Sequence, residues 1–405
     1  MRVLLSAYAC EPNKGSEQEI GWQRALHMPP FADEVWVLTR SNNQTVIEAD
    51  PLSRTRGLHF IYYDLPPWAL RFKKLAGVLP IYIMMWQWGA YRLAAKHHRE
   101  KRFDSVYHVT FSGMLSGSFM GRLGIPLIVG PIGGGERAPF PLRRGMPAVC
   151  RFKELLRDLG IILQRHNPLT CPALAAAERI YVTTPESLQL VQRKWRYKTE
   201  VQLSVGHSSS QTPQQTERRP SPLPRFVFVG RLLHWKGVHF AIRALDEARR
   251  TVPAATLTIF GSGPAERWLR DLAKSCGVAD AVEFAGHVPH QQVVDSLLSY
   301  TALVFPSLHD SGGLAVLESF SRGLPVVCLD LGGPGVMVNG SCGFVIPTAH
   351  ADEAQVVTEV ANAMISLASM SATELERLSQ GAIARAHELS WASLTERVAR
   401  RGGLG

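Results

Sequence analysis

The sequence lacks the cysteine and histidine spacings that build a metal site or a disulfide framework. Its 405 residues contain six cysteines, none in a CxxC pair, and no His-x-x-x-His completes a zinc set. A structural metal is therefore not expected, and scattered cysteines indicate a reducing compartment such as the cytoplasm. The short apolar run at the N-terminus predicts a buried first strand rather than a signal peptide.

A dinucleotide fingerprint is also missing. No GxGxxG follows the first expected strand of either half, where the chain reads "SAYACEPNKGSEQEIG" and "VGRLLHWKG". This argues against an ordinary NAD-dependent enzyme. No internal repeat of 20–50 residues is present either.

Positive charge is concentrated in the first half of the chain. Residues 1–204 contain 27 Lys and Arg against 16 Asp and Glu, whereas residues 205–405 contain 17 against 18. The excess indicates an anionic partner, such as phosphates, nucleic acid or an anionic membrane face, unless it is simply a solvated surface. Aromatic residues do not alternate with the basic clusters, which disfavours a binder of single-stranded nucleic acid.

The apolar run Leu75–Ala95 has about the length of a membrane span, but Pro80, Gln87 and Arg92 interrupt it. Its Trp and Tyr residues also crowd the middle, unlike those of a true span. Two interpretations stay open: a helix lying in a bilayer surface, or a helix packing on the core of its own domain.

Apolar runs alternate with helical patterns throughout both halves, which predicts an α/β protein with two doubly wound parallel sheets. A polar, proline-rich linker at 204–224 separates a first domain, 1–203, from a second, 225–385. The segment 386–405 is expected to form a helix that returns to the first domain. Two such domains imply a cleft, with ligands at the carboxyl ends of the strands. Strands are predicted at 2–8, 34–40, 58–64, 105–110, 126–132, 179–185, 225–231, 255–263, 281–288, 302–307, 324–330 and 343–348.

Three loops contain residues suited to phosphate binding. Lys14, Gly15 and Ser16 precede a predicted helix, where free amides bind anions, although a plain turn with a serine cap remains the alternative. In the second half, Arg231 and Lys236 follow a buried strand. Two cations there can stabilise a diphosphate as it gains charge on leaving, although either alone would be an ordinary surface base.

The third loop begins after the strand at 302–307 and places Asp310 before a Gly-Gly pair. Glu318 follows eight residues later inside a predicted helix, so the two acids cannot form an adjacent acid/base pair. Glu318 lies among apolar residues, and a buried acid needs a partner. A pair of ligand hydroxyls or Arg322 would serve.

The motifs "VGRLLHWKG", "IFGSGP", "FAGHV", "PSLHDSGGLAVLESFSRGLPVV" and "GGPGVMVNGSCGFVI" occur in the order found in the retaining glycosyltransferases of family 4. The chain resembles this family, which has the two-domain GT-B fold, almost throughout its second half. The first half resembles it more loosely, through "ACEPNKGSEQEIGW" and "GPIGGGE". One departure is Asp310, which stands where the family has Glu.

The resemblance implies a role for each matching residue. Arg231 and Lys236 would bind the donor diphosphate, Glu318 the ribose hydroxyls and Asp310 the donor sugar. Further donor contacts would come from Gly15, Ser16, Gly230, Gly261, Val288, Gly312, Gly313 and Leu314.

Two assignments in the first half keep an alternative. His108 resembles a cleft histidine near the sugar, but a lone histidine is often a core residue. Gly134 and Glu136 would border the acceptor, although a flexible connection is an equal alternative.

The resemblance thus implies a retaining, metal-independent hexosyltransferase that uses a nucleotide-diphosphate sugar as co-substrate and no cofactor. The chain lacks the Asp-x-Asp of metal-using relatives. The expected acceptor is a glycan, a glycolipid or a lipid-linked sugar of bacterial polysaccharide or glycoconjugate biosynthesis. The expected location is the cytoplasm, with peripheral contact to the inner face of the membrane through the basic domain. The alternatives are an epimerase or hydrolase, a small-molecule glycosyltransferase, and a non-catalytic scaffold; no nucleic-acid partner is expected.

Overall fold

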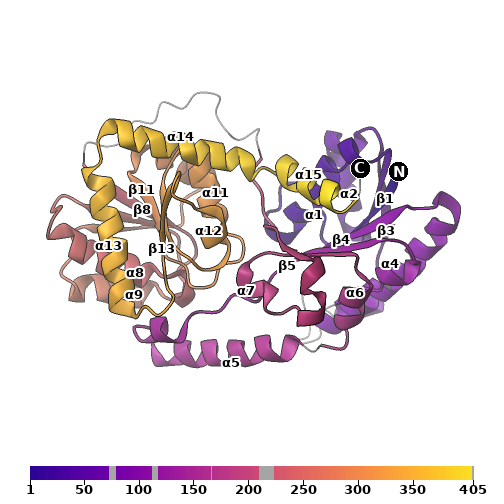
Figure 1. Cartoon of the computed structure of the whole chain (residues 1–405), viewed down its shortest axis with the longest axis horizontal. Helices are drawn as coiled ribbons and strands as arrows, with labels where there is room; N and C mark the ends of the chain where they lie inside the picture. Colours follow the sequence, from indigo (N-terminus) through magenta and orange to yellow (C-terminus); the bar gives the residue numbers. More distant parts are fainter. Residues whose placement is uncertain (73–78, 112–116, 166, 209–222, 404–405) are drawn as a thin grey trace. The chain divides into compact units, whose positions relative to one another are not determined.

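The computed structural model describes residues 1–72, 79–111, 117–165, 167–208 and 223–403. Its contacts divide the chain into two compact units (Figure 1). Unit 1 comprises Met1–Gly135, Leu159–Val205 and Trp391–Gly405, and unit 2 comprises Glu136–Asp158 and Gly206–Ser390.

Unit 1 is built on a parallel sheet with the strand order β3-β2-β1-β4-β5-β6-β7. Every residue of β4 and β5 is buried, as expected for strands covered on both faces. The strands are β1 (Arg2–Ala7), β2 (Glu34–Arg40), β3 (Leu58–Tyr63), β4 (Ser105–Thr110), β5 (Leu127–Ile132), β6 (Arg179–Val182) and β7 (Thr199–Val201). The helices are α1 (Ser16–His27), α2 (Gln44–Ala49), α3 (Pro67–Phe72), α4 (Leu79–Lys101), α6 (Cys171–Ala176), α7 (Pro185–Leu188) and α15 (Trp391–Arg401).

Unit 2 contains a second parallel sheet with the order β10-β9-β8-β11-β12-β13, and helices cover both of its faces (Figure 1). Its strands are β8 (Arg225–Val229), β9 (Thr256–Phe260), β10 (Val282–Gly286), β11 (Ala302–Phe305), β12 (Val326–Leu329) and β13 (Gly343–Ile346). Its helices are α8 (Val238–Arg249), α9 (Glu266–Ser275), α10 (His290–Ser296), α11 (Leu314–Ser321), α12 (Gly332–Met337), α13 (Glu353–Ser369) and α14 (Ala372–Glu388). The helix α5 (Ala148–Gln164) begins in unit 2 and ends in unit 1.

Both strand orders reverse direction once. The chain runs outward from β1 to β3 and then returns to place β4 beside β1, and β11 lies beside β8 in the same way. Such reversals are the points where ligands bind in open α/β sheets. The prediction of two doubly wound parallel sheets is confirmed.

Local signals explain where several of these helices begin and end. Asp352 and Ser371 each accept a hydrogen bond from the amide three residues later, and the side chains of Gln355 and Glu374 return one. These capping boxes satisfy amides that a helix start leaves without partners. Gly277 follows α9 with a φ of +71°, and a left-handed glycine just after the last turn is a common end of a helix.

The division of the chain differs from the predicted one. The sequence placed residues 1–203 in one domain, whereas residues 136–158 pack with unit 2. Of the predicted linker at 204–224, residues 209–222 lie outside the described residues. The short strand β7 at the edge of the first sheet was not anticipated.

The apolar run Leu75–Ala95 falls mainly on α4, and its first four residues lie outside the described part of the chain. Tyr82, Ile83, Trp86 and Ala90 are buried in the core of unit 1. One side of this helix therefore packs internally. Among the described residues, no helix is long and apolar enough to cross a membrane.

Candidate functional site

The carboxyl ends of β8 and β11 bring Lys236 and Asp310 together. Lys236 lies in a short 3-10 helix, His234–Lys236, and its ammonium group donates to Oδ2 of Asp310 in an ion pair. Both side chains are partly buried. Because this is where the strand order reverses, the pair lies at the expected ligand-binding point of unit 2.

The loops that carry this pair are fastened to each other. The carbonyl of Trp235 accepts the amide of Leu308 at 2.8 Å and the hydroxyl of Ser307 at 3.3 Å. Gly237 has a φ of +72°, and a Cβ there would lie 1.8 Å from the carbonyl oxygen of Pro306. Glycine thus permits both the left-handed turn and the close approach of the two loops.

Asp310 is held from its own loop as well. Its Oδ1 accepts the amides of Gly312 and Gly313, each at 3.3 Å. Gly313 has a φ of +61° and immediately precedes α11. The carbonyl of Asp310 accepts the amide of Gly333 at 2.7 Å, which ties this loop to the start of α12. The carboxylate therefore has a fixed position beside the lysine. Leu314, the first residue of α11, is exposed.

The remaining predicted donor residues of unit 2 follow the carboxyl ends of adjacent strands. Gly230 and Arg231 come directly after β8, Gly261 directly after β9, and Val288 shortly after β10. Arg231 is exposed, and no hydrogen bond or ion pair of its guanidinium involves the described residues. Its cation is thus available to an anionic ligand.

Glu318 is less buried than its apolar neighbours led us to expect. Its side chain is 25% exposed, and Oε1 accepts a hydrogen bond from Nε2 of His290 at 2.8 Å. That bond raises the pKa of His290 above its ordinary value. The structural alternative of an Arg322 partner is wrong, because Arg322 pairs with Asp295 at 3.0 Å.

The sequence analysis missed a buried cluster next to this site. Oε1 of Glu154, on α5, accepts hydrogen bonds from Nε2 of His234 at 2.7 Å and from Nε2 of His309 at 3.1 Å. Burial raises the pKa of this carboxyl, but the two histidines outweigh that effect and hold it at about 2. The ring of Trp235 stacks on His309 with centroids 5.0 Å apart.

This cluster joins the two loops that carry Lys236 and Asp310, because His234 and His309 are close neighbours of those residues in the chain. In the sequence, this cluster was indicated only by the two histidines that stand beside the motif residues Lys236 and Asp310. Glu154, in a distant and otherwise amphipathic segment, gave no signal.

In unit 1, the predicted residues lie near the carboxyl ends of β1 and β4. Gly15 is exposed and immediately precedes α1, whose start has no side-chain cap. Ser16 is the first residue of that helix. Amides at a helix start attract anions, and anion binding by this loop stays a prediction.

His108 lies within β4 and is fully buried. Its Nδ1 is 3.1 Å from the hydroxyl of Ser6, and Nε2 has no hydrogen-bond partner among the described residues. Burial lowers its pKa to about 4, so the ring is neutral at pH 7. Both alternatives for His108 therefore remain: a core histidine, or a ring with one nitrogen reserved for a ligand.

The two predicted acceptor residues fall into different units. Gly134 lies in unit 1, whereas Glu136 begins the segment that packs with unit 2. Glu136 is buried, and its carbonyl accepts a hydrogen bond from the guanidinium of Arg157 at 3.1 Å. The structure thus gives Glu136 a place within the fold of unit 2.

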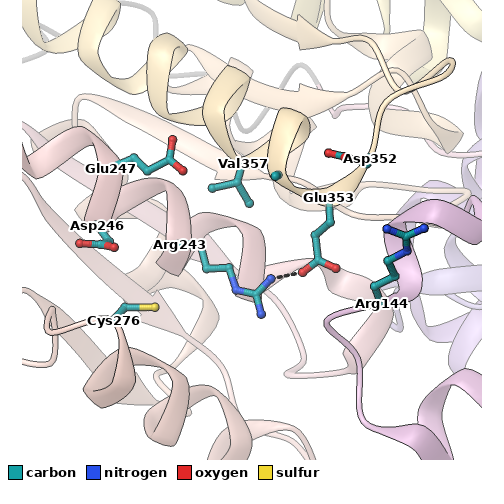
Figure 2. A pocket seen from close by; sticks show the side chains of 9 residues that line it. Arg144, Arg243, Asp246, Glu247, Cys276, Asp352, Glu353 and Val357 are labelled. Carbon is teal, nitrogen blue, oxygen red and sulfur yellow. Dashed lines mark hydrogen bonds and ion pairs between the residues drawn. The ribbon is translucent and has the colours of Figure 1, made fainter.

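A pocket of about 490 Å³ lies in unit 2 apart from all the predicted residues (Figure 2). Glu353 at its wall contacts Arg243 and accepts the amide of Gly145 at 2.5 Å. Because Gly145 belongs to the segment 136–158, Glu353 fastens that segment to unit 2. The lining residues include Arg144, Arg243, Glu247, Asp352, Glu353 and Val357.

No group of three or more His, Cys, Asp or Glu side chains suited to a metal ion is present in the part of the chain that the structure describes. The candidate site is therefore a set of cations, carboxylates and backbone amides. Such a set suits a ligand with a diphosphate and several hydroxyls.

Residues 210–373 match the model of the family Glycosyl transferases group 1. The matched segment contains Arg231, Lys236, Asp310 and Glu318. The glycogen synthase of Mycobacterium tuberculosis (strain CDC 1551 / Oshkosh) is 42% identical over 128 residues, which are 31% of this chain and 31% of that protein. The match thus spans about a third of this curated relative.

Solved structures are similar over the whole chain. The apo form of the lipopolysaccharide outer core galactosyltransferase WaaB gives a TM-score of 0.60 at 13% identity, with 100% of both chains covered. Anabaena Alr3699/HepE in complex with UDP and glucose gives 0.55 at 13% identity, with 98% of both covered. These likenesses establish the GT-B fold.

Proposed function

We propose that the protein is a retaining glycosyltransferase that moves a sugar from a nucleotide-diphosphate sugar to a hydroxyl of a glycan, a glycolipid or a lipid-linked sugar. The observation that carries the proposal is the Lys236–Asp310 pair at the point where the strand order of unit 2 reverses. It lies within the segment that matches the group 1 family. The complex of the similar HepE chain with UDP and glucose supports a nucleotide-sugar donor.

The donor would lie across the carboxyl ends of β8 and β11. Arg231 and Lys236 would bind the diphosphate, and Glu318 would accept hydrogen bonds from the ribose hydroxyls, which the 25% exposure of its side chain permits. Asp310 would accept from hydroxyls of the donor sugar. The negative charge of the diphosphate grows as the glycosidic bond breaks. The two cations therefore stabilise the leaving diphosphate more than they stabilise the bound donor.

We propose a front-face displacement for the transfer itself. The acceptor hydroxyl oxygen forms a bond to the anomeric carbon as the bond from that carbon to the diphosphate oxygen breaks. The hydroxyl proton passes to the departing diphosphate, so that no separate base is needed. Attack from the side of the leaving group retains the anomeric configuration. Because the sequence has no Asp-x-Asp, we expect the transfer to need no divalent ion.

A panel of nucleotide sugars tests the donor assignment. A true donor binds the folded form alone and raises its melting temperature. NMR of the anomeric protons, with and without candidate acceptors, then distinguishes a transferase from an epimerase or a hydrolase. A changed sugar without acceptor would indicate an epimerase, free sugar a hydrolase, and stabilisation without turnover a scaffold.

We further propose that the protein acts at the inner face of the cytoplasmic membrane, where a lipid-linked acceptor would be held. The basic excess of residues 1–204 supports an anionic surface as the partner.

A further inference from the structure

The helix α5 exposes an apolar stripe along one side. At about 100° per residue, its large apolar side chains fall within an arc of about 140°, wide enough for an interfacial helix. Each is between 54% and 67% exposed. The stripe comprises Val149, Phe152, Leu155, Leu156, Leu159, Ile162 and Leu163. The helix is uninterrupted from Ala148 to Gln164 (Figure 1), so the stripe is a property of this single element.

The opposite side of α5 anchors it to unit 2. Glu154 is buried against His234 and His309, as described above. Arg157 donates to the carbonyl of Glu136. The orientation of the helix about its axis is therefore fixed, and the apolar stripe faces outward as a consequence of packing.

Positive charge borders the stripe. Arg151 and Lys153 are exposed and flank it on its two edges. Residues 136–165 contain seven Lys and Arg against three Asp and Glu. Of these acids, Glu136 and Glu154 are buried, and Asp158 pairs with Arg137 and Arg143. The exposed charged residues of the segment 136–165 are consequently all basic.

We infer that α5 is the surface by which the protein docks on an anionic phospholipid bilayer, with the stripe in the acyl boundary and Arg151 and Lys153 at the headgroups. An apolar face bordered by basic residues is the pattern of an interfacial helix. A second copy of the chain would bring the same cations face to face, which disfavours self-association. The inference rests on the membrane contact proposed above and assigns it to one helix.

The helix α4, to which the sequence pointed, is the weaker candidate. It exposes Leu79, Ile81, Met85 and Trp88, but each only between 38% and 54%. Trp88 moreover packs against Phe119 and Arg122. Its outward apolar surface is therefore smaller than that of α5.

Vesicle co-sedimentation of the full chain tests the assignment, without donor or acceptor. We expect binding to vesicles of phosphatidylglycerol and phosphatidylcholine, weak binding to phosphatidylcholine alone, and release at high salt. The double variant Phe152→Ser/Leu156→Ser should bind about tenfold less, because two exposed apolar side chains lose their burial in lipid. Arg151→Gln/Lys153→Gln should reduce binding to the anionic vesicles alone.

The matched control is Ile81→Ser/Met85→Ser on α4, which should bind like the wild type. Thermal unfolding confirms that each variant is folded. Equal binding by the α5 variants would overturn the assignment to α5 and leave the membrane contact standing. Absence of binding by the wild type would overturn both, while donor stabilisation would still test the transferase function. A third outcome is a wild type that does not bind vesicles and forms a dimer, while the α5 variants are monomeric. This result would show that a second copy of the chain covers the apolar stripe, and it would overturn the inference.

Discussion

At the scale of single residues, the candidate site depends on how Lys236 is oriented. Its ammonium group has three donors, and the bond to Asp310 uses one of them. The pair therefore holds the cation in place and leaves donors for phosphate oxygens. Asp310, shorter by a methylene than the Glu of the resembled family, reaches this position because the amides of Gly312 and Gly313 hold it.

Replacing Lys236 by alanine should lower kcat/KM for the donor by about 10²- to 10³-fold, because a cation that stabilises the leaving diphosphate is lost. Glu318→Ala should instead weaken donor binding and raise KM. Steady-state kinetics with the donor and acceptor selected by the panel measure both. The control is Lys274→Ala, an exposed lysine of α9. Wild-type turnover in both site variants would contradict the proposed function.

The carboxylate of Glu154 should make stability depend on acid pH. Its pKa falls from an ordinary 4.5 to about 2 on folding, so the unfolded chain binds the proton first. The stabilisation is complete above about pH 4.5 and is lost as pH falls toward 2, with an upper limit of about 3 kcal/mol. Urea unfolding between pH 2 and 7 should show this loss in the wild type and not in Glu154→Gln.

The matched control for Glu154 is Glu359→Gln, since Glu359 is an exposed acid of α13. It should keep the wild-type pH dependence. If the free energy of unfolding of Glu154→Gln fell at acid pH as much as that of the wild type, the two histidines would not stabilise this carboxylate.

At the scale of elements, the short turn before α8 sets the distance between the two loops of the site. Gly237→Ala should destabilise unit 2 by about 3 kcal/mol or more. The new Cβ would clash with the carbonyl oxygen of Pro306, and alanine would also be strained at the positive φ of this position. Gly277→Ala is the matched control: its φ is +71° against +72°, and nothing lies within 4 Å of its added Cβ. That variant should cost only about 1 kcal/mol. If urea unfolding showed that both variants lose the same free energy of unfolding, the contact between Gly237 and Pro306 would not limit the size of residue 237.

Elements also mark the limit of prediction from sequence. Buried strands such as β4 and β11 appear as apolar runs, and their positions were predicted because local composition suffices. The short strand β7 was missed, since three residues give no periodic signal. The helix α5 has a clear apolar side, but periodicity does not say which element covers that side, or that none does.

At the scale of the whole molecule, the chain returns to its first unit at the end. Arg24 is fully buried in α1 and donates to the hydroxyl of Thr395 at 3.2 Å and the carbonyl of Leu203 at 3.4 Å. Its guanidinium lies 5.7 Å from the ring centroid of Trp391. The fold of unit 1 thus includes its last helix.

Leu394→Ala should therefore destabilise unit 1 by about 2–5 kcal/mol, because this leucine is fully buried in α15. Calorimetry should show a lower unfolding temperature for unit 1. The unfolding transition whose temperature a bound nucleoside diphosphate raises should stay unchanged. Leu52→Ala, at a leucine 55% exposed in the same unit, is the control and should change little. A shift of the ligand-sensitive transition instead would assign α15 to unit 2.

The sequence by itself determined the parallel strands, the helix caps and the set of residues at the ends of β8 and β11, because period, capping and turn chemistry are local. Only the tertiary structure decided that residues 136–158 pack with unit 2, that Glu154 bridges His234 and His309, and that His290 rather than Arg322 is the partner of Glu318. Such pairings join residues far apart in the chain. They are fixed by which surfaces the folded chain brings into contact, and a local pattern contains no information about that.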